Sequence, residues 1–380
     1  MAKHLLPRDS MSQLSELFAA ELSKTPQLHG PQSPARVRGL RAGHQTLVSA
    51  PGTASAEAAR EAREPKTIVQ LNSLPFAIDV NQYSNPHSSS NPTGSYQSAY
   101  RLSSLADAIP QLTVYYGGSL GTVHKVWGRL LNSANATSEY TADLLLDAKT
   151  AFKNSRMAGM AGFPEDWYLV TAQPENWYDI AKDDAHLIPI EIKMSSDAEG
   201  HDDFISLDAQ EGQLGWKVGG SSPISLNPAT TIKSIRLKVL RVDFKRPWFD
   251  YEIFQQRDWS IKGVGQGHYS SGKLKDNDGV FPLITIGMLI GSKVSIEGDF
   301  AKEDLKVLRD QSGQELSLGP FLIKSADAPL KMSRGSAQGT VIDSNIRQII
   351  GYLSNLVPLS PALPASTVAD TAGSRPSTGR

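Results

Sequence analysis

The stretch TIKSIRLKVLRVDF, residues 231–244, is the clearest β-strand of this chain and decides its fold class. Charged residues alternate with apolar ones along it, which is the period of a half-buried strand. The apolar residues are Ile235, Leu237, Val239, Leu240, Val242 and Phe244. Their phase shifts by one residue at Val239–Leu240, so we predict a β-bulge there that turns both halves to the same buried face.

Other short strands surround this one in the sequence. Gly, Pro and Asp separate them, which is typical of a largely antiparallel, sandwich-like body. The predicted strands are residues 167–172, 186–192, 213–218, 247–254, 280–290, 293–300 and 316–325. The segment 280–290 has apolar residues on both faces, so we expect it to be buried on both sides.

The helical part is predicted at about residues 121–155, as a hairpin or one kinked helix. Two sets of apolar residues have helical spacing there, and the sequence NSANATSE between them is a poor helix former. Thr137 or Ser138 is the expected N-cap of the second helix. A further short helix is expected between residue 301 and Gly313.

Residues 342–357 fit two structures. The spacing of Ile342, Ile346, Ile349 and Leu353 favours a helix, while the cluster IIGYL fits a buried strand. The helix is the prediction here.

The fold class is therefore α+β: a helical hairpin or kinked helix beside a largely antiparallel β-rich body. Composition divides the chain into three parts: an N-terminal extension (1–66), a globular body (67–360) and a tail (361–380). Both ends are rich in small and polar residues, so we expect them to be flexible.

The composition excludes several classes of function. The chain has no cysteine, so it has no disulfide, thiolate metal site or cysteine nucleophile. Its formal net charge of −1 gives no support to general nucleic-acid binding. We find no signal peptide, and the longest apolar run, Val280 to Gly291, is too short to span a membrane as a helix. We expect a cytoplasmic protein, with export by a signal-independent route left open.

No complete catalytic or cofactor motif is present. Gly267 to Lys273 has the G-x4-G-K frame of a phosphate loop, but Leu274 replaces the Ser or Thr that binds magnesium. Asp276 to Gly279 reads as a turn, and the eight histidines are scattered. We therefore expect no cofactor and no metal, and we favour a protein that is not an enzyme.

Four tryptophans each have an acidic residue within two positions: Trp167, Trp177, Trp248 and Trp259. An indole ring beside a carboxylate is typical of a sugar-binding groove. The alternative is that these rings are half-buried at the ends of strands.

The N-terminal segment from Met11 to about Lys24 predicts a short amphipathic helix. Its apolar stripe consists of Leu14, Leu17, Phe18 and Leu22. Because the following segment has little apolar content, the helix would be tethered and free to dock on a partner. The alternative is that it packs on its own body and completes the core.

The function predicted from these features is a non-catalytic binding or assembly protein, with the N-terminal helix docking on a protein partner. Two alternatives remain open. The first is a membrane-active, pore-forming toxin-like protein that uses the apolar stretch Val280 to Ile290. The second is a carbohydrate-binding or carbohydrate-active protein that uses the tryptophans.

Overall fold

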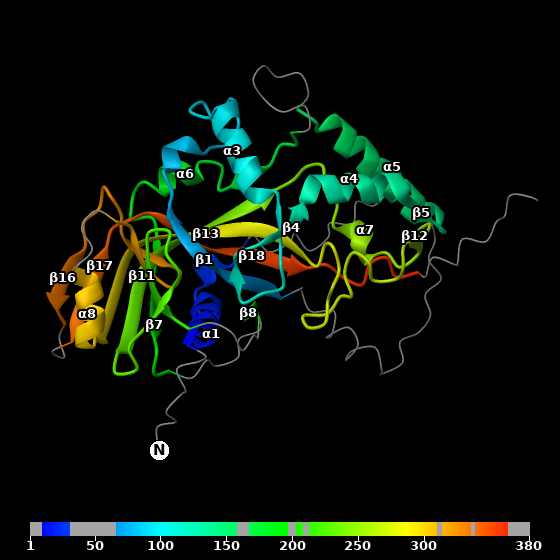
Figure 1. Ribbon diagram of the computed structural model, residues 1–380. Coiled ribbons are helices and arrows are strands. Elements are labelled where there is room, and N and C mark those ends of the chain that lie inside the picture. The colour runs from blue at the N-terminus through cyan, green and yellow to red at the C-terminus, as the bar shows by residue number, and fades with distance from the viewer. Residues whose placement is uncertain are drawn as a thin grey trace, which may run out of the picture.

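The computed structural model describes residues 10–30, 66–157, 167–196, 203–207, 213–309, 314–335 and 339–363. These residues form an α+β fold in three layers (Figure 1). A ten-stranded sheet lies in the middle. A layer of helices covers one of its faces, and helix α1 with a small four-stranded sheet covers the other. The chain thus has the predicted fold class.

Two long strands form the centre of the large sheet: β11 (Thr231–Lys245) and β13 (Leu283–Asp299). On its other edge, β11 pairs with β6 (Thr171–Gln173) and β7 (Ile188–Lys193). On the far edge of β13 lie β17 (Thr340–Ser344) and β18 (Gln348–Leu356). The sheet continues from β17 to β16 (Lys331–Arg334), and from β18 to β1 (Thr67–Ala77). Strands β3 (Tyr115–Tyr116) and β8 (Phe204–Ser206) run parallel to β1, and the other pairings are antiparallel.

The prediction of a bulge at Val239–Leu240 is wrong. The pairing of β11 with β13 runs without a break from Lys238 to Asp243. Ile235, Leu237 and Val239 pack in the core on the α1 side, and Leu240, Val242 and Phe244 in the core on the helical side. The phase of the apolar residues shifts because the two covering layers lie over opposite ends of the strand.

A bulge is present elsewhere in this pair of strands. The register of β11 and β13 shifts between Arg236 and Lys238, where β13 has one more residue than β11. Lys293 lies at this bulge in β13 and has a positive φ of 54°.

The helical layer contains α3 (Tyr96–Ala106), α4 (Val123–Ser133), α5 (Glu139–Asn154) and the short α6 (Trp177–Ile180) and α7 (Glu252–Gln255). Between them lie a 3₁₀ turn (Val80–Gln82) and two small sheets, β2 (Ala108–Pro110) with β4 (Ser119–Thr122) and β5 (Ala134–Ala136) with β12 (Trp259–Ile261). The predicted pair of helices is confirmed as α4 and α5, and Ser138 caps α5 by accepting from the Thr141 N–H. The strand predicted at 247–254 is wrong, since this segment forms a turn followed by α7.

The opposite layer contains α1 (Ser10–Ser23), a 3₁₀ turn (Pro26–Leu28), α8 (Lys302–Arg309) and the four-stranded sheet. This sheet has the order β10 (Ile224–Ser225), β9 (Gly215–Val218), β14 (Leu316–Leu318) and β15 (Phe321–Lys324). Buried Asp304 ties α8 to its surroundings by accepting hydrogen bonds from Trp216 Nε1 at 2.8 Å, the Asn227 N–H at 3.1 Å and the Thr230 hydroxyl.

The helix predicted at 342–357 is wrong, because this segment forms β17 and β18. Ile349 and Tyr352 pack in the core on the helical side, while Ile350 and Leu353 pack in the core on the α1 side. A strand buried on both faces can show apolar residues at helical spacing, because almost every position is apolar.

Candidate functional site

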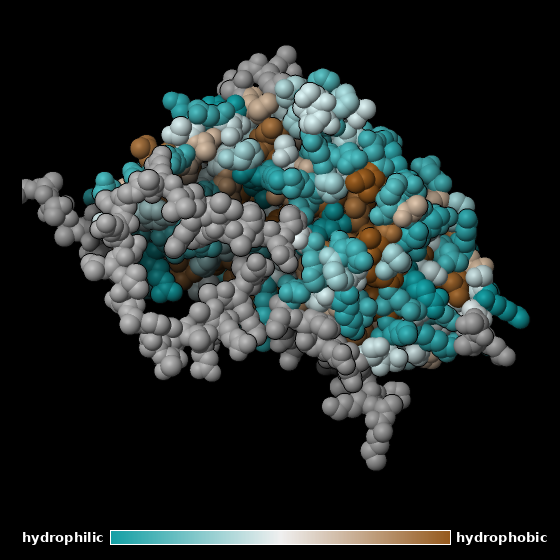
Figure 2. All heavy atoms as spheres, turned by 180° about the vertical axis from the view of Figure 1, so that it is seen from behind, coloured by the Kyte–Doolittle hydropathy of each residue, from teal (hydrophilic) through white to brown (hydrophobic). Residues whose placement is uncertain are grey.

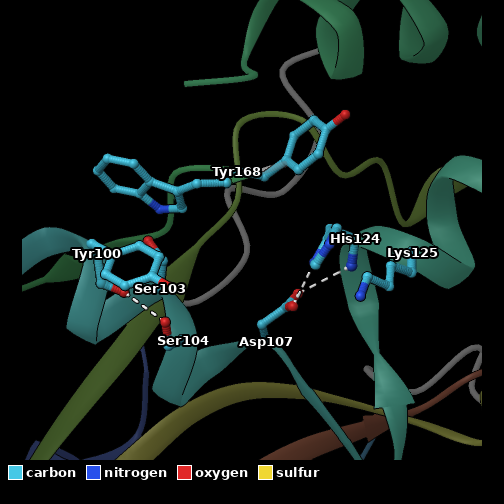
Figure 3. A pocket seen from close by; sticks show the side chains of 8 residues that line it. Tyr100, Ser103, Ser104, Asp107, His124, Lys125 and Tyr168 are labelled. Atoms are coloured by element: carbon cyan, nitrogen blue, oxygen red, sulfur yellow. Dashed lines mark hydrogen bonds and ion pairs between the residues drawn. The ribbon is translucent and has the colours of Figure 1, made fainter. Parts of the chain in front are cut away.

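A small hollow of about 200 Å³ opens between α3, the first turn of α4 and residues 167–168 (Figure 3). Polar and aromatic side chains line it, among them Tyr100, Ser103, Ser104, Asp107, His124 and Tyr168. It combines an imidazole and a carboxylate, so it is the first candidate for a site with chemistry.

Asp107 and His124 meet because one helix ends where another begins. Asp107 follows the last residue of α3, and its backbone oxygen accepts from the Val123 N–H at 2.7 Å. Its carboxylate accepts from the His124 N–H at 3.0 Å and from His124 Nδ1 at 2.5 Å. A carboxylate at this position satisfies a free N–H of α4 and faces the positive end of the helix dipole. The pair therefore has a clear structural role.

Arg246 joins the end of α3 to strand β13 of the large sheet. Its guanidinium donates to the backbone oxygens of Ala106 at 2.5 Å and Thr285 at 2.7 Å. Burial lowers the pKa of Arg246 to about 10, and the nearby Asp107 carboxylate opposes this shift. The cation is kept in the core because backbone dipoles and a nearby carboxylate surround it.

The hollow does not contain a catalytic triad. Such a triad requires a serine hydroxyl that donates to the imidazole. The Ser103 hydroxyl donates to the Ala99 oxygen at 2.9 Å, and that of Ser104 to the Tyr100 oxygen at 3.0 Å. His124 Nε2 is buried, and Tyr168 stacks on the imidazole at 5.5 Å between ring centroids. We therefore assign the pair the role of joining α3 to α4.

The second candidate is the glycine loop that the sequence singled out. After Lys273 the chain continues in bends and reaches β13 without a helix, so the loop does not lead into a helix as a phosphate loop does. Residues 267–270 are instead bonded to the chain around Ser360. Tyr269 N–H donates to the Ser360 oxygen at 2.8 Å, and Ser360 N–H donates to the Ser270 oxygen at 2.9 Å. The loop is thus fixed by a segment about ninety residues away in the sequence.

We define residues 266–280 together with Leu359 as the C-terminal loop surface. A hollow of about 520 Å³ lies in it, lined by charged residues such as Lys273 and Asp276 and by Leu359. Three large apolar side chains remain exposed here, namely Leu274 (39%), Val280 (38%) and Leu359 (39%). On the face shown in Figure 2, too, hydrophobic residues reach the surface in small groups among hydrophilic ones.

The four tryptophans of the predicted sugar groove are buried: Trp167 (4% exposed), Trp177 (0%), Trp248 (1%) and Trp259 (0%). Trp248 Nε1 donates to the Leu169 oxygen at 2.8 Å and Trp259 Nε1 to the Ile253 oxygen at 2.9 Å. Trp177, Trp248 and Trp259 belong to the core on the helical side. Their ring faces pack against other side chains and are not open to a sugar ring.

The predicted docking stripe on α1 is also buried. Leu14, Phe18 and Leu22 are 0% exposed and Leu17 is 4% exposed. Polar contacts fix both ends of the helix: Ser10 Oγ accepts from the Leu214 N–H at 2.9 Å, and Ser23 Oγ accepts from the Phe204 N–H at 3.2 Å. Of the two interpretations of this helix, the structure shows the one in which it completes the core of its own chain.

The remaining sequence candidates carry no further site. Among the described residues, no group of three or more metal-binding side chains lies together. His201, one of the eight histidines, lies outside those residues. None of the described helices is both long and apolar enough to cross a membrane. Most of the apolar stretch 280–290 lies within β13, which starts at Leu283 and is paired on both edges.

Comparison of the chain with known protein families, with curated proteins and with solved structures finds no match. The function must therefore be inferred from the chain itself. Asp107 and His124 were not among the residues predicted from the sequence, and the loop of residues 267–279 was considered there only as a phosphate loop and a turn, not as a binding surface. The sequence does carry a signal for α3, the helix that ends just before Asp107. Ser95 is its N-cap, and Ala99, Leu102 and Ala106 follow at helical spacing.

Proposed function

We propose that this chain is a non-catalytic binding or assembly protein that acts through contacts with other proteins. The observation that carries this proposal is the C-terminal loop surface. It combines three exposed apolar side chains, Leu274, Val280 and Leu359, with a hollow lined by charged and polar groups, and exposed apolar groups within a polar surround are typical of protein interaction sites.

The loop is held in shape before any partner arrives. Ser270 Oγ donates to the Val357 oxygen at 2.5 Å, and the Asn277 side chain accepts from the Ser271 N–H at 2.9 Å. Phe281 N–H donates to the Tyr269 oxygen at 2.8 Å. Because these bonds are already formed, a partner would lose little free energy in ordering the loop. A fixed surface with exposed Leu274, Val280 and Leu359 thus supports recognition of a folded protein.

The other two functions receive less support. A membrane-active role for residues 280–290 would require the central strand to leave the sheet, which breaks pairing on two edges. A sugar-binding role for the tryptophans would require buried rings to reach the surface. The binding role needs no rearrangement of the fold.

Site-specific photo-crosslinking tests the proposal. A photoreactive amino acid is placed at position 359 of the full chain, in the cells that make the protein, and at position 224 as a control. Ile224 is also an exposed apolar residue, at 48%, but it lies on β10. We expect one discrete protein adduct from position 359, which unlabelled chain competes away.

The crosslinked partner is then identified, and the affinity between the purified partner and this chain is measured. Burying a leucine contributes about 1.5–3 kcal/mol, so Leu359→Glu should weaken the binding at least tenfold. Ile224→Glu should leave it unchanged. Equal adducts from both positions, or none from position 359, would overturn the proposal.

A further inference from the structure

Helix α5 has a buried inner face and an exposed outer face. The inner face consists of Thr141, Leu145 and Ala148. Leu146 points outward and is 62% exposed, more than any other large apolar side chain among the described residues. It lies at the midpoint of the helix, which runs from residue 139 to residue 154.

Charged residues are arranged symmetrically about Leu146. Glu139 lies seven residues before it and Lys153 seven residues after it. At 3.6 residues per turn these two side chains project about 20° to either side of Leu146, on the same outer face. Ala142 and Thr150, both small, lie four residues to either side. The line through Leu146 therefore has an acidic side chain at its first end and a basic one at its second, while Asp143, Asp147 and Lys149 lie about 60–100° to its sides.

This pattern is complementary to itself when the helix direction is reversed. If a second α5 lies antiparallel across the first, a two-fold axis brings Leu146 of one copy against Leu146 of the other. Glu139 of each copy then faces Lys153 of the other, and the small residues Ala142 and Thr150 allow the helices to approach. A two-fold contact uses the same patch on both chains, which requires self-complementarity of this kind.

We propose that the outer face of α5 is an interface between two copies of this chain, formed by antiparallel pairing around Leu146. The inference rests on the proposed assembly function and names one of its partners. It concerns a surface separate from the C-terminal loop surface.

The protein holds α5 rigidly in place for this contact. Thr141 Oγ1 donates to Asp258 Oδ1 at 2.7 Å, and the Tyr140 hydroxyl donates to Glu252 Oε1 at 2.7 Å. Near the other end, Phe152 stacks on Tyr168 with ring centroids 4.1 Å apart. The outer side chains are therefore presented on a fixed element of the fold, which lowers the entropic cost of association.

The expected association is reversible and salt-dependent. A helix of sixteen residues is about 24 Å long, so the pair buries less area than a standard stable interface. Ion pairs at such a surface are screened by salt. The dimer should therefore form at high protein concentration and weaken as salt is added.

A charge exchange tests the pairing with the full-length chain. Glu139→Lys and Lys153→Glu should each weaken self-association at least tenfold in sedimentation equilibrium, because like charges then face each other twice. An equimolar mixture of the two variants should associate again, because every facing pair is then of opposite sign. A difference in folding cannot explain this rescue, because the mixture contains only the two variants that did not self-associate on their own. Glu303→Lys, an exposed position on α8, is the matched control and should leave association unchanged.

A single cysteine provides the second measurement, because the natural chain has none. Under mild oxidation Leu146→Cys should give a disulfide-linked dimer, while Ile224→Cys should remain monomeric. No linked dimer from Leu146→Cys, or a mixture that stays monomeric, would overturn the α5 interface. The crosslink at position 359 is read separately, so its failure would count against the proposed function and not against this interface.

Discussion

Replacing Phe18 by alanine tests whether α1 belongs to the core. Phe18 is 0% exposed and lies in the same cluster as Val69 and Leu71 of β1. Deleting a buried phenylalanine side chain costs about 3–5 kcal/mol, because transfer energy is lost and a cavity remains. If the helix instead served only a separate partner, the same substitution would leave the stability of the chain unchanged.

The expected shift in melting temperature follows from the size of the folded part. The structure describes roughly 290 residues, and unfolding entropy is about 2.1 cal/mol/K per residue, or about 0.6 kcal/mol/K in total. A loss of about 3–5 kcal/mol then lowers the melting temperature by about 5–8 °C.

Differential scanning calorimetry measures this shift, with circular dichroism at 222 nm as an independent signal. Lys24→Ala is the matched control, since Lys24 is exposed at the end of the same helix and its ion pair with Glu21 lies at the surface. It should change stability by no more than about 0.5 kcal/mol. If Phe18→Ala melted within one degree of the unchanged chain, α1 would not be part of the core in solution. The interpretation of α1 as a tethered helix that docks on a partner would then be the better one.

Two further predictions concern buried and half-buried carboxylates. Asp304→Ala leaves three donors without their acceptor, so it should cost about 3 kcal/mol or more in chemical unfolding, while Glu303→Ala, next to it and exposed, should cost little. Burial raises the pKa of Asp184, but the hydrogen bond from Ser292 and the charge of Arg347 outweigh this and hold the pKa below 3.8. The stability that ionised Asp184 contributes is present above pH 3.8 and is lost as pH falls through its lowered pKa. The difference in melting temperature between the unchanged chain and Asp184→Asn should therefore be constant from about pH 7 to 5 and shrink below about pH 4. A difference that grows on acidification would show that the pKa is raised.

The helices of residues 123–154 could be predicted because their signals are local. Ser138 caps the helix that follows it, and Thr141, Leu145 and Ala148 recur at helical spacing. The same signals exist for α3, where Ser95 precedes a run of suitable spacing, so that helix was within reach of the sequence. Such features depend only on neighbours within a few residues.

The features that the sequence did not predict depend on distant parts of the chain. Residues 342–357 form strands because β13 and β1 pair with both edges of β18 and apolar layers cover both of its faces. The phase shift at Val239–Leu240 has the same cause, since α1 and the helical layer cover different ends of β11. A period-2 or period-3.6 pattern assumes one buried face, and it fails where there are two.

The candidate sites were hard to predict for a related reason. A tryptophan next to an acidic residue has the same sequence whether the ring is exposed or, as for Trp248, 1% exposed in the core. The loop around Gly267 is shaped by its bonds to Ser360, which no short motif contains. Residue identity gives the chemistry that is available, while the fold decides which of it reaches solvent.

The outer face of α5 shows how the two kinds of information combine. The order Glu139, Leu146, Lys153 is local and can be read directly from the sequence. Its meaning depends on a fact that only the structure gives, namely that all three side chains are exposed, away from the face of α5 that buries Thr141, Leu145 and Ala148. On a buried face, Leu146 would be an ordinary core residue. On an exposed face it loses the free energy of burial, and a second copy of the same face restores that burial while pairing the charges.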